Sequence, residues 1–173
     1  MSAGLGIAIA TGMFIAAIGP INSVLQDRLG TWGMVTLVHL IGLLAAAAGF
    51  LLFERNLFVE GRLGPGLRLL AWGAWTALVL GVVWLAAAPL RGLPPYAFLG
   101  GVLGVAVVVG TILAIQHLGV LAALTVIVAS QLLTAALIDQ FGWFGQVPIT
   151  MTPTRTAGLL LVLLGVMLMM RKT

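Results

Sequence analysis

The chain has 173 residues, of which 62% are hydrophobic and 7% are charged. A soluble domain averages about 45–50% apolar and about 25% charged residues, so this composition excludes a soluble globular monomer and predicts one integral membrane domain over residues 1–173. The net charge of +4 is scattered, which gives no nucleic-acid-binding face, and the absence of cysteine excludes disulfides and thiol chemistry in this chain.

The apolar segments predict the number of membrane crossings. A spanning helix needs about 20 mainly apolar residues. The first run has no basic region before it and is too long for a signal peptide, so we interpret it as a retained span. The chain is thus predicted to be an all-α, polytopic membrane helix bundle of about six transmembrane helices: 4–25, 32–53, 69–88, 97–116, 119–138 and 155–170.

Segment 69–88 distinguishes a six-span chain from a five-span chain. With six spans, five of the eight Lys and Arg residues lie on the side of the termini, which predicts both termini in the cytoplasm of a bacterial-type inner (plasma) membrane. The five-span chain gives the same count. Trp32, Tyr96 and Trp143 fall at one interface only with six spans, and such an aromatic belt favours that arrangement.

Small residues recur at four-residue spacing in several of these spans. In lipid, helices associate by close packing over such residues, so we expect tight helix contacts there, within the chain or with another subunit. Chance spacing in spans rich in Gly and Ala is the alternative. The helix-packing candidates are Gly4, Gly12, Gly73, Gly81, Gly100 and Gly104.

A few polar side chains within or near the ends of the spans are the candidates for a substrate pathway. Gln131 and Thr134 share a helix face, as do Ser130 and Thr134, and Asp139 lies two turns beyond Gln131, so these residues could form a polar strip reaching one interface. Alternatively, Gln131 bonds a neighbouring helix, and Asp139 ends its helix and caps the following segment. The full set is Asn22, His39, Ser130, Gln131, Thr134 and Asp139.

His39 and Pro20 each allow two interpretations. His39 either bonds a backbone carbonyl or faces protons or substrate. Pro20 either kinks the first span and frees carbonyls near Asn22, or simply breaks the helix before the interface. His39 and His117 lack the spacing of a metal site, and no nucleophile–base pattern or phosphate-binding loop is present, so we expect no enzyme, metal or cofactor.

Several stretches of the chain resemble one known family. The sequences "YAFLGGVLG" and "LGVLAALTVIVASQLLTAALIDQFGWFG", and the run 21–42 with Asn22 and Gly30, are similar to the half-length, single-repeat (YdcZ-like) branch of the drug/metabolite transporter superfamily. The resemblance covers 1–53 and 96–171 and leaves 54–95 unmatched. Its carboxy-terminal motif consists of Gln131, Asp139, Gly142, Gly145, Arg155 and Gly158.

The resemblance implies a five-helix transporter repeat with one extra span. Such a chain needs a second copy or a paralogous membrane subunit to complete a cavity in the bilayer. The glutamate of the related small multidrug resistance proteins is missing from the first span, so their mechanism is not expected here. The predicted function is a transporter subunit that moves a small uncharged or amphiphilic solute as a homo- or heterodimer. The alternative is a non-transport accessory subunit of a larger membrane complex, which scarce embedded charge and abundant Gly/Ala faces would suit.

Overall fold

The computed structural model describes residues 2–53, 64–87 and 92–170, and every regular element in these ranges is helical. The predicted all-α fold is therefore confirmed. The elements in chain order are α1 (Ser2–Phe53), α3 (Pro65–Ala87), the short 3₁₀ helix η1 (Pro95–Phe98), α4 (Leu99–Leu118), α5 (Val120–Phe141), the short 3₁₀ helix η2 (Trp143–Gly145) and α6 (Pro153–Met170).

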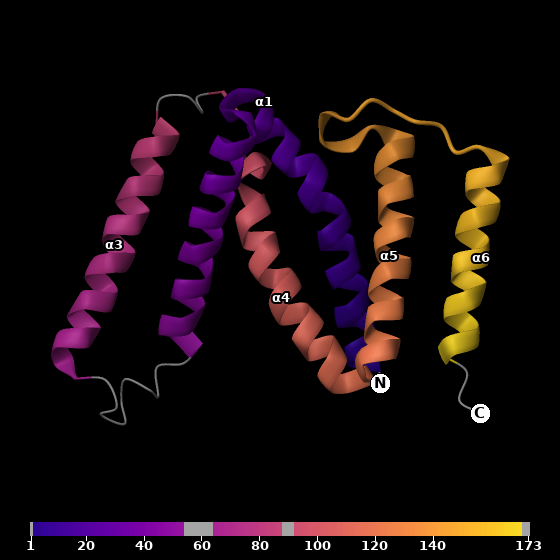
Figure 1. Cartoon of the computed structure of the whole chain (residues 1–173), viewed down its shortest axis with the longest axis horizontal. Helices are drawn as coiled ribbons and strands as arrows, with labels where there is room; N and C mark the ends of the chain where they lie inside the picture. Colours follow the sequence, from indigo (N-terminus) through magenta and orange to yellow (C-terminus); the bar gives the residue numbers. More distant parts are fainter. Residues whose placement is uncertain (1, 54–63, 88–91, 171–173) are drawn as a thin grey trace.

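The first helix is a hairpin of two antiparallel halves. α1 has 52 residues, more than twice the number that one crossing requires, and it doubles back at Gly30 (φ 68, ψ 172). Glycine adopts these angles readily, whereas a side chain would clash with its own backbone. The first half, 2–29, and the second half, 31–53, therefore run in opposite directions, and α4 lies between them (Figure 1). The two halves correspond to the predicted helices 4–25 and 32–53.

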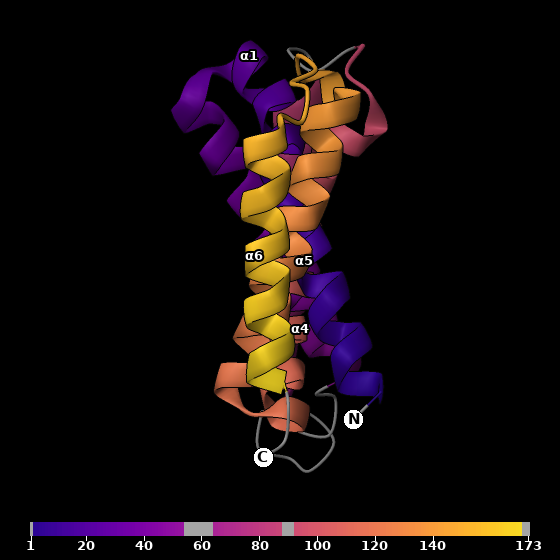
Figure 2. The same ribbon diagram turned by 90° about the vertical axis from the view of Figure 1, so that its right-hand side faces the viewer.

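The helices form a broad, thin array. Figure 1 shows, in spatial order, α3, the second half of α1, α4, the first half of α1, α5 and α6, and the view along the edge is much narrower (Figure 2). α1 packs mainly against α4 and α5. α3 packs mainly against α1, and α6 mainly against α5, so both outer helices have extensive contacts on one side only.

The lengths and hydropathies of the helices identify a multi-pass membrane protein. Among the described residues, Ser2–Phe53, Pro95–Leu118 and Val120–Phe141 are long and apolar enough to cross a membrane, with mean hydropathies of 2.3, 2.5 and 2.2, and Pro153–Met169 is a shorter apolar helix. α3 is the helix expected over 69–88. That α3 also crosses the membrane, giving six crossings, stays a prediction.

The core consists of small and branched side chains where α1, α4 and α5 meet. One cluster joins Ala8, Ala114, Ala123, Val126 and Ile127. A second cluster lies near the bend of α1 and joins Leu25, Leu37 and Ala97. Large apolar side chains are exposed on every long helix of the described chain, as lipid-facing surfaces require.

Three of the predicted packing glycines lie against a neighbouring helix. A Cβ atom built on Gly12 would collide with Ser130 Oγ and the Ile127 carbonyl of α5. One built on Gly4 would meet the His117 side chain at the end of α4, and one on Gly100 would collide with Asn22 Oδ1 of α1.

The other three packing glycines have no such neighbour. A Cβ atom built on Gly73, Gly81 or Gly104 meets no described atom within 4 Å. For Gly73 and Gly81 the reason is position, because α3 stands at the edge of the array and packs mainly on α1 (Figure 1). On α4, close approach occurs at Gly101 and Gly110 instead, against the second and first halves of α1 respectively.

Candidate functional site

The first half of α1 and α5 meet in a close seam where Gly12 faces Ser130. Ser130 is 7% exposed, and its hydroxyl donates a hydrogen bond of 3.0 Å to the Ile127 carbonyl of its own helix. The hydroxyl is thereby satisfied within α5, since a serine has one proton to donate. Ser130 therefore fills the space opposite Gly12, and the contact holds α5 at a fixed distance from α1.

Gln131 and Thr134 lie beside this seam and are half-buried. Within the described part of the chain, neither side chain forms a hydrogen bond with another residue. A carboxamide offers two N–H donors and an oxygen acceptor, and leaving such groups unpaired in hydrocarbon costs several kcal/mol. The described chain thus does not show Gln131 bonding a neighbouring helix. Its partners in a membrane would come from water, solute or another subunit.

Asp139 lies two residues before the end of α5 and is half-buried. Its backbone carbonyl accepts a hydrogen bond of 2.7 Å from the Ile149 N–H. The helix continues to Phe141 and ends on Gly142 in the left-handed conformation (φ 63, ψ 35), whose N–H bonds the Ile138 carbonyl. No side chain caps η2. The alternative in which Asp139 ends its helix and caps the following segment is therefore wrong, because glycine supplies the termination.

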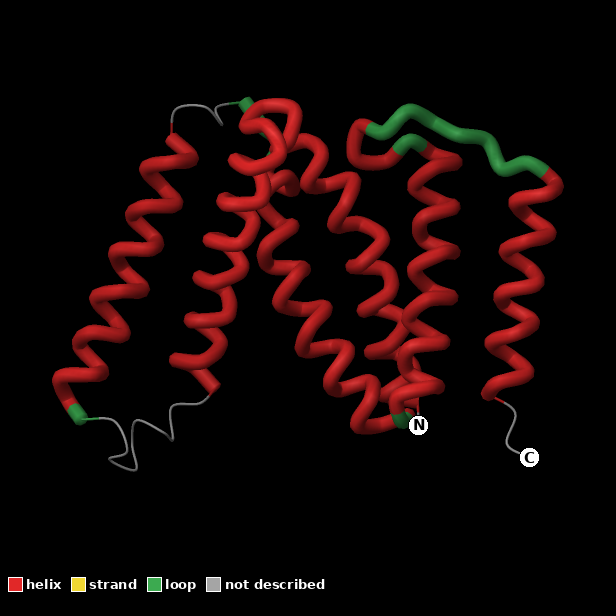
Figure 3. Tube along the Cα trace, viewed as in Figure 1, coloured by secondary structure: helices red, strands yellow, loops and turns green. Residues whose placement is uncertain are grey.

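The loop between α5 and α6, residues 142–152, crosses the end of the bundle (Figure 3), and we call it the strap. Gln146 Nε2 in the strap donates to Ser23 Oγ of α1 at 3.0 Å, and Ser23 Oγ donates to the Pro20 carbonyl at 2.7 Å. Phe144 packs edge-to-face on Tyr96 of η1, with ring centroids 5.7 Å apart. These contacts tie the strap to α1 and η1.

Pro20 lies inside α1 without ending it, so the interpretation as a plain helix break is wrong. Ser23, rather than Asn22, bonds the carbonyl of Pro20 itself. Asn22 Oδ1 is buried and has no hydrogen-bond partner among the described residues. It lies against Gly100 of α4, where a side chain of any size would collide with it.

His39 lies on the exposed side of the second half of α1. Its Nδ1 is 2.8 Å from the Val35 carbonyl. A carbonyl only accepts hydrogen bonds, so Nδ1 carries the proton, and Nε2 is left as an acceptor in the neutral ring. His117 bonds the Leu113 carbonyl in the same way. The predicted carbonyl bond is present. The second half of α1, which carries His39, is separated from α5 by α4 and the first half of α1 (Figure 1).

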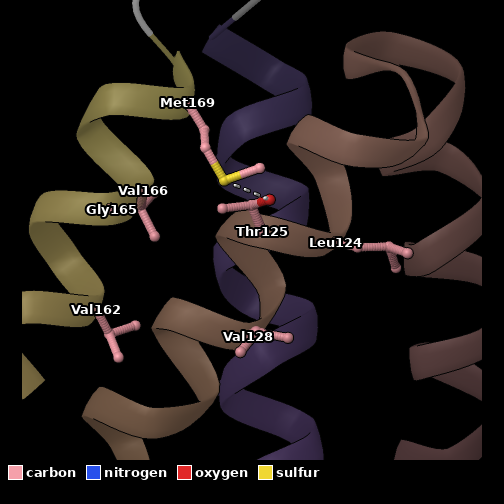
Figure 4. A pocket seen from close by; sticks show the side chains of 7 residues that line it. All are labelled: Leu124, Thr125, Val128, Val162, Gly165, Val166 and Met169. Carbon is pink, nitrogen blue, oxygen red and sulfur yellow. Dashed lines mark hydrogen bonds between the residues drawn. The ribbon is translucent and has the colours of Figure 1, made fainter.

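A shallow apolar groove of about 360 Å³ separates α5 from α6. Among the lining side chains, that of Thr125 contains an oxygen atom. Its hydroxyl donates a hydrogen bond to the Leu121 carbonyl and lies 3.8 Å from Met169 Sδ (Figure 4). The lining residues are Leu124, Thr125, Val128, Val162, Gly165, Val166 and Met169. No sequence signal marked this groove, since its side chains are ordinary members of apolar helices.

The comparison with protein families assigns the chain. A family described as "Putative inner membrane exporter, YdcZ" matches residues 3–168. The chain belongs to the YdcZ family. This family of membrane exporters stands within the drug/metabolite transporter superfamily, so the predicted resemblance is confirmed. No curated protein and no solved structure matches the chain.

The extent of the match corrects one expectation. The resemblance left 54–95 unmatched, but the YdcZ match runs from residue 3 to residue 168 and includes that segment. The matched range therefore includes segment 54–95, with α3 inside it. The recognised motifs lay in the regions of α1, α4, α5 and α6, whereas α3 is mainly apolar and supplied no recognised motif.

Proposed function

We propose that this YdcZ-family chain is one subunit of an exporter for a small uncharged or amphiphilic solute, and that a second copy or a paralogue completes the pathway. The observation that carries this proposal is the thin array of an exporter-family chain (Figures 1 and 2). A pathway across a membrane must be surrounded by protein, because lipid cannot solvate a polar route. Two facing arrays would enclose such a route.

The side chains along the α1–α5 seam support an uncharged solute. Gln131 and Thr134 beside the seam are neutral, as is Asn22 where α1 meets α4. The carboxylates of the described chain lie near helix ends, with Asp27 before the bend and Asp139 near the end of α5. A charged solute deep in the membrane would need an opposite charge or a water-filled site. Neutral hydrogen-bonding groups suit hydroxyl, amide or similar solutes instead.

The test measures assembly and transport on the same purified protein. Native mass spectrometry from lipid nanodiscs should show two copies, or one copy with a paralogue. Vesicles containing the protein are loaded with a small-molecule extract of the expressing cells, and the loss of each solute is followed by mass spectrometry. One or a few uncharged solutes should leave faster than from protein-free vesicles. Fixed association with other membrane proteins and no solute loss would instead support the accessory-subunit alternative.

Gln131→Leu tests the role of the seam. Leu has a similar volume, and no hydrogen bond within the described chain is lost. We expect a folded, assembled protein whose solute loss is slowed roughly twofold to tenfold, because one hydrogen bond contributes about 0.5–1.5 kcal/mol. Gln116→Leu, on the exposed end of α4, is the matched control and should transport normally. Equal rates for both variants would remove Gln131 from the pathway.

A further inference from the structure

The seam between the first half of α1 and α5 is tight at Gly12 and open farther along. Gly12, Gly19 and Ser23 lie on one face of α1, because residues seven or eleven positions apart differ by only about 20° around a helix. A Cβ atom built on Gly12 would collide with Ser130 Oγ, whereas one built on Gly19 meets no described atom within 4 Å, and Gly19 is exposed. Both helices run away from the N-terminal end (Figure 1), so the seam widens toward the strap.

The strap crosses the wide end of the seam and touches the bundle through alternate residues. Phe144 and Gln146 are half-buried, whereas the residues on either side of them are exposed. Gln146 is the residue that bonds Ser23 of α1, and Phe144 is the residue whose ring packs on Tyr96 of η1. Ser23 also continues the face of α1 that carries Gly12 and Gly19. The contact of the strap with α1 therefore lies directly over the seam.

The strap consists of a fixed part and a tip, which we define as residues 144–147. The Ile149 N–H donates to the Asp139 carbonyl at 2.7 Å, and the Met151 N–H donates to Gln140 Oε1 at 2.8 Å. These two bonds fix the part after the tip to the end of α5. The tip itself is joined to α1 and η1 by one side-chain hydrogen bond and one ring contact, which are individually weak. The tip can therefore leave α1 while the fixed part stays in place.

The backbone of Phe144 is strained while the tip lies on the bundle. Its φ of 60 and ψ of 29 fall in the left-handed region, and Phe144 is the non-glycine residue of the described chain with a positive φ. A bulky side chain holds this conformation only where its surroundings require it, and such residues cluster at switch regions. The ring contact with Tyr96 supplies that requirement. Release of the ring relieves the strain, which favours movement of the tip.

We propose that the strap tip is the gate at this end of the solute pathway, an inference that rests on the proposed transport function. A transporter opens its pathway to one side of the membrane at a time, so each end needs a barrier that moves. The tip on α1 separates the widened seam from water. Opening breaks the bond from Gln146 to Ser23 and parts Phe144 from Tyr96. The strap lies at the end remote from the N-terminus (Figure 1), which is the outer end when the termini are cytoplasmic.

The first test locks the tip onto α1. The chain has no cysteine, so Ser23→Cys combined with Gln146→Cys can be joined selectively by a short, membrane-permeant bifunctional methanethiosulfonate. Vesicles loaded with the cell extract should then lose solute only as fast as protein-free vesicles, and reduction should restore the loss. Gln140→Cys combined with Met151→Cys is the matched control, because it joins two residues in hydrogen-bond contact within the fixed part. Its solute loss should be the same before and after joining.

The outcomes separate the gate from transport itself. Unchanged solute loss after Ser23→Cys and Gln146→Cys are joined would overturn the gate and leave export standing. A loss that falls equally in the control pair would also overturn it, because the tip would then have no special role. Wild-type vesicles that lose no solute would refute the transport function, and the gate with it.

A second measurement follows the tip without any solute. Spin labels at Val147→Cys and Trp32→Cys, both exposed in the wild type, report the distance from the tip to α1 by pulsed electron resonance. Labelled chains are diluted in unlabelled protein within nanodiscs. Ser23→Ala removes one hydrogen bond and should raise the population at longer distance about twofold to tenfold. Thr150→Cys in place of Val147→Cys reports the fixed part and should show no change. A tip distance that Ser23→Ala leaves unaltered would make the proposal wrong even if solute is exported.

Discussion

At the scale of single residues, Gly12 determines how closely α1 approaches α5. A methyl group there would overlap Ser130 Oγ and the Ile127 carbonyl, so Gly12→Ala must push the helices apart. Overpacking of this kind costs about 1–3 kcal/mol. We expect a matching loss in the free energy of unfolding, measured by denaturant titration in mixed micelles. Gly6→Ala, on the same helix with no atom within 4 Å, is the control and should be neutral or slightly stabilising.

At the scale of elements, the bend at Gly30 makes one long helix into an antiparallel pair. Its positive φ of 68 with ψ 172 is strained for any other residue, although no atom lies within 4 Å of a Cβ built there. Gly30→Ala should therefore cost about 1–3 kcal/mol of stability through the backbone alone. Gly49→Ala in the same helix, where φ is not positive and space is open, should not destabilise. Equal unfolding energies for both variants would contradict this account of the bend.

At the scale of the whole molecule, the alternating helices place the start of α3 and the strap at opposite ends (Figure 1). The chain has no cysteine, so single-cysteine variants can be labelled selectively with a membrane-impermeant maleimide in intact cells. With six crossings and cytoplasmic termini, Gly64→Cys and Thr173→Cys should label only after permeabilisation, whereas Thr150→Cys should label directly. Opposite behaviour of Gly64→Cys and Thr173→Cys would show that 69–88 does not cross.

Much of the architecture follows from local chemistry. Apolar runs of about 20 residues must become helices in lipid, because only a helix satisfies the backbone hydrogen bonds of a single segment. Glycines with positive φ bend or end these helices at Gly30 and Gly142. Residue patterns were also sufficient to recognise the YdcZ family, and spacing alone found Gly4, Gly12 and Gly100. These features depend on residues near one another in sequence, which is why they could be predicted.

The contacts between distant segments could not be derived in this way. Nothing in the spacing of Gly73, Gly81 and Gly104 distinguishes them from glycines that meet a helix, since the outcome depends on which helices are neighbours in the array. The bond from Gln146 to Ser23 joins residues 123 positions apart, and the burial of Asn22 Oδ1 depends on α4. The outward position of His39 likewise follows from the face that α4 and α3 leave uncovered. Packing geometry decides each of these, because lipid gives helices no strong hydrophobic drive toward one particular partner.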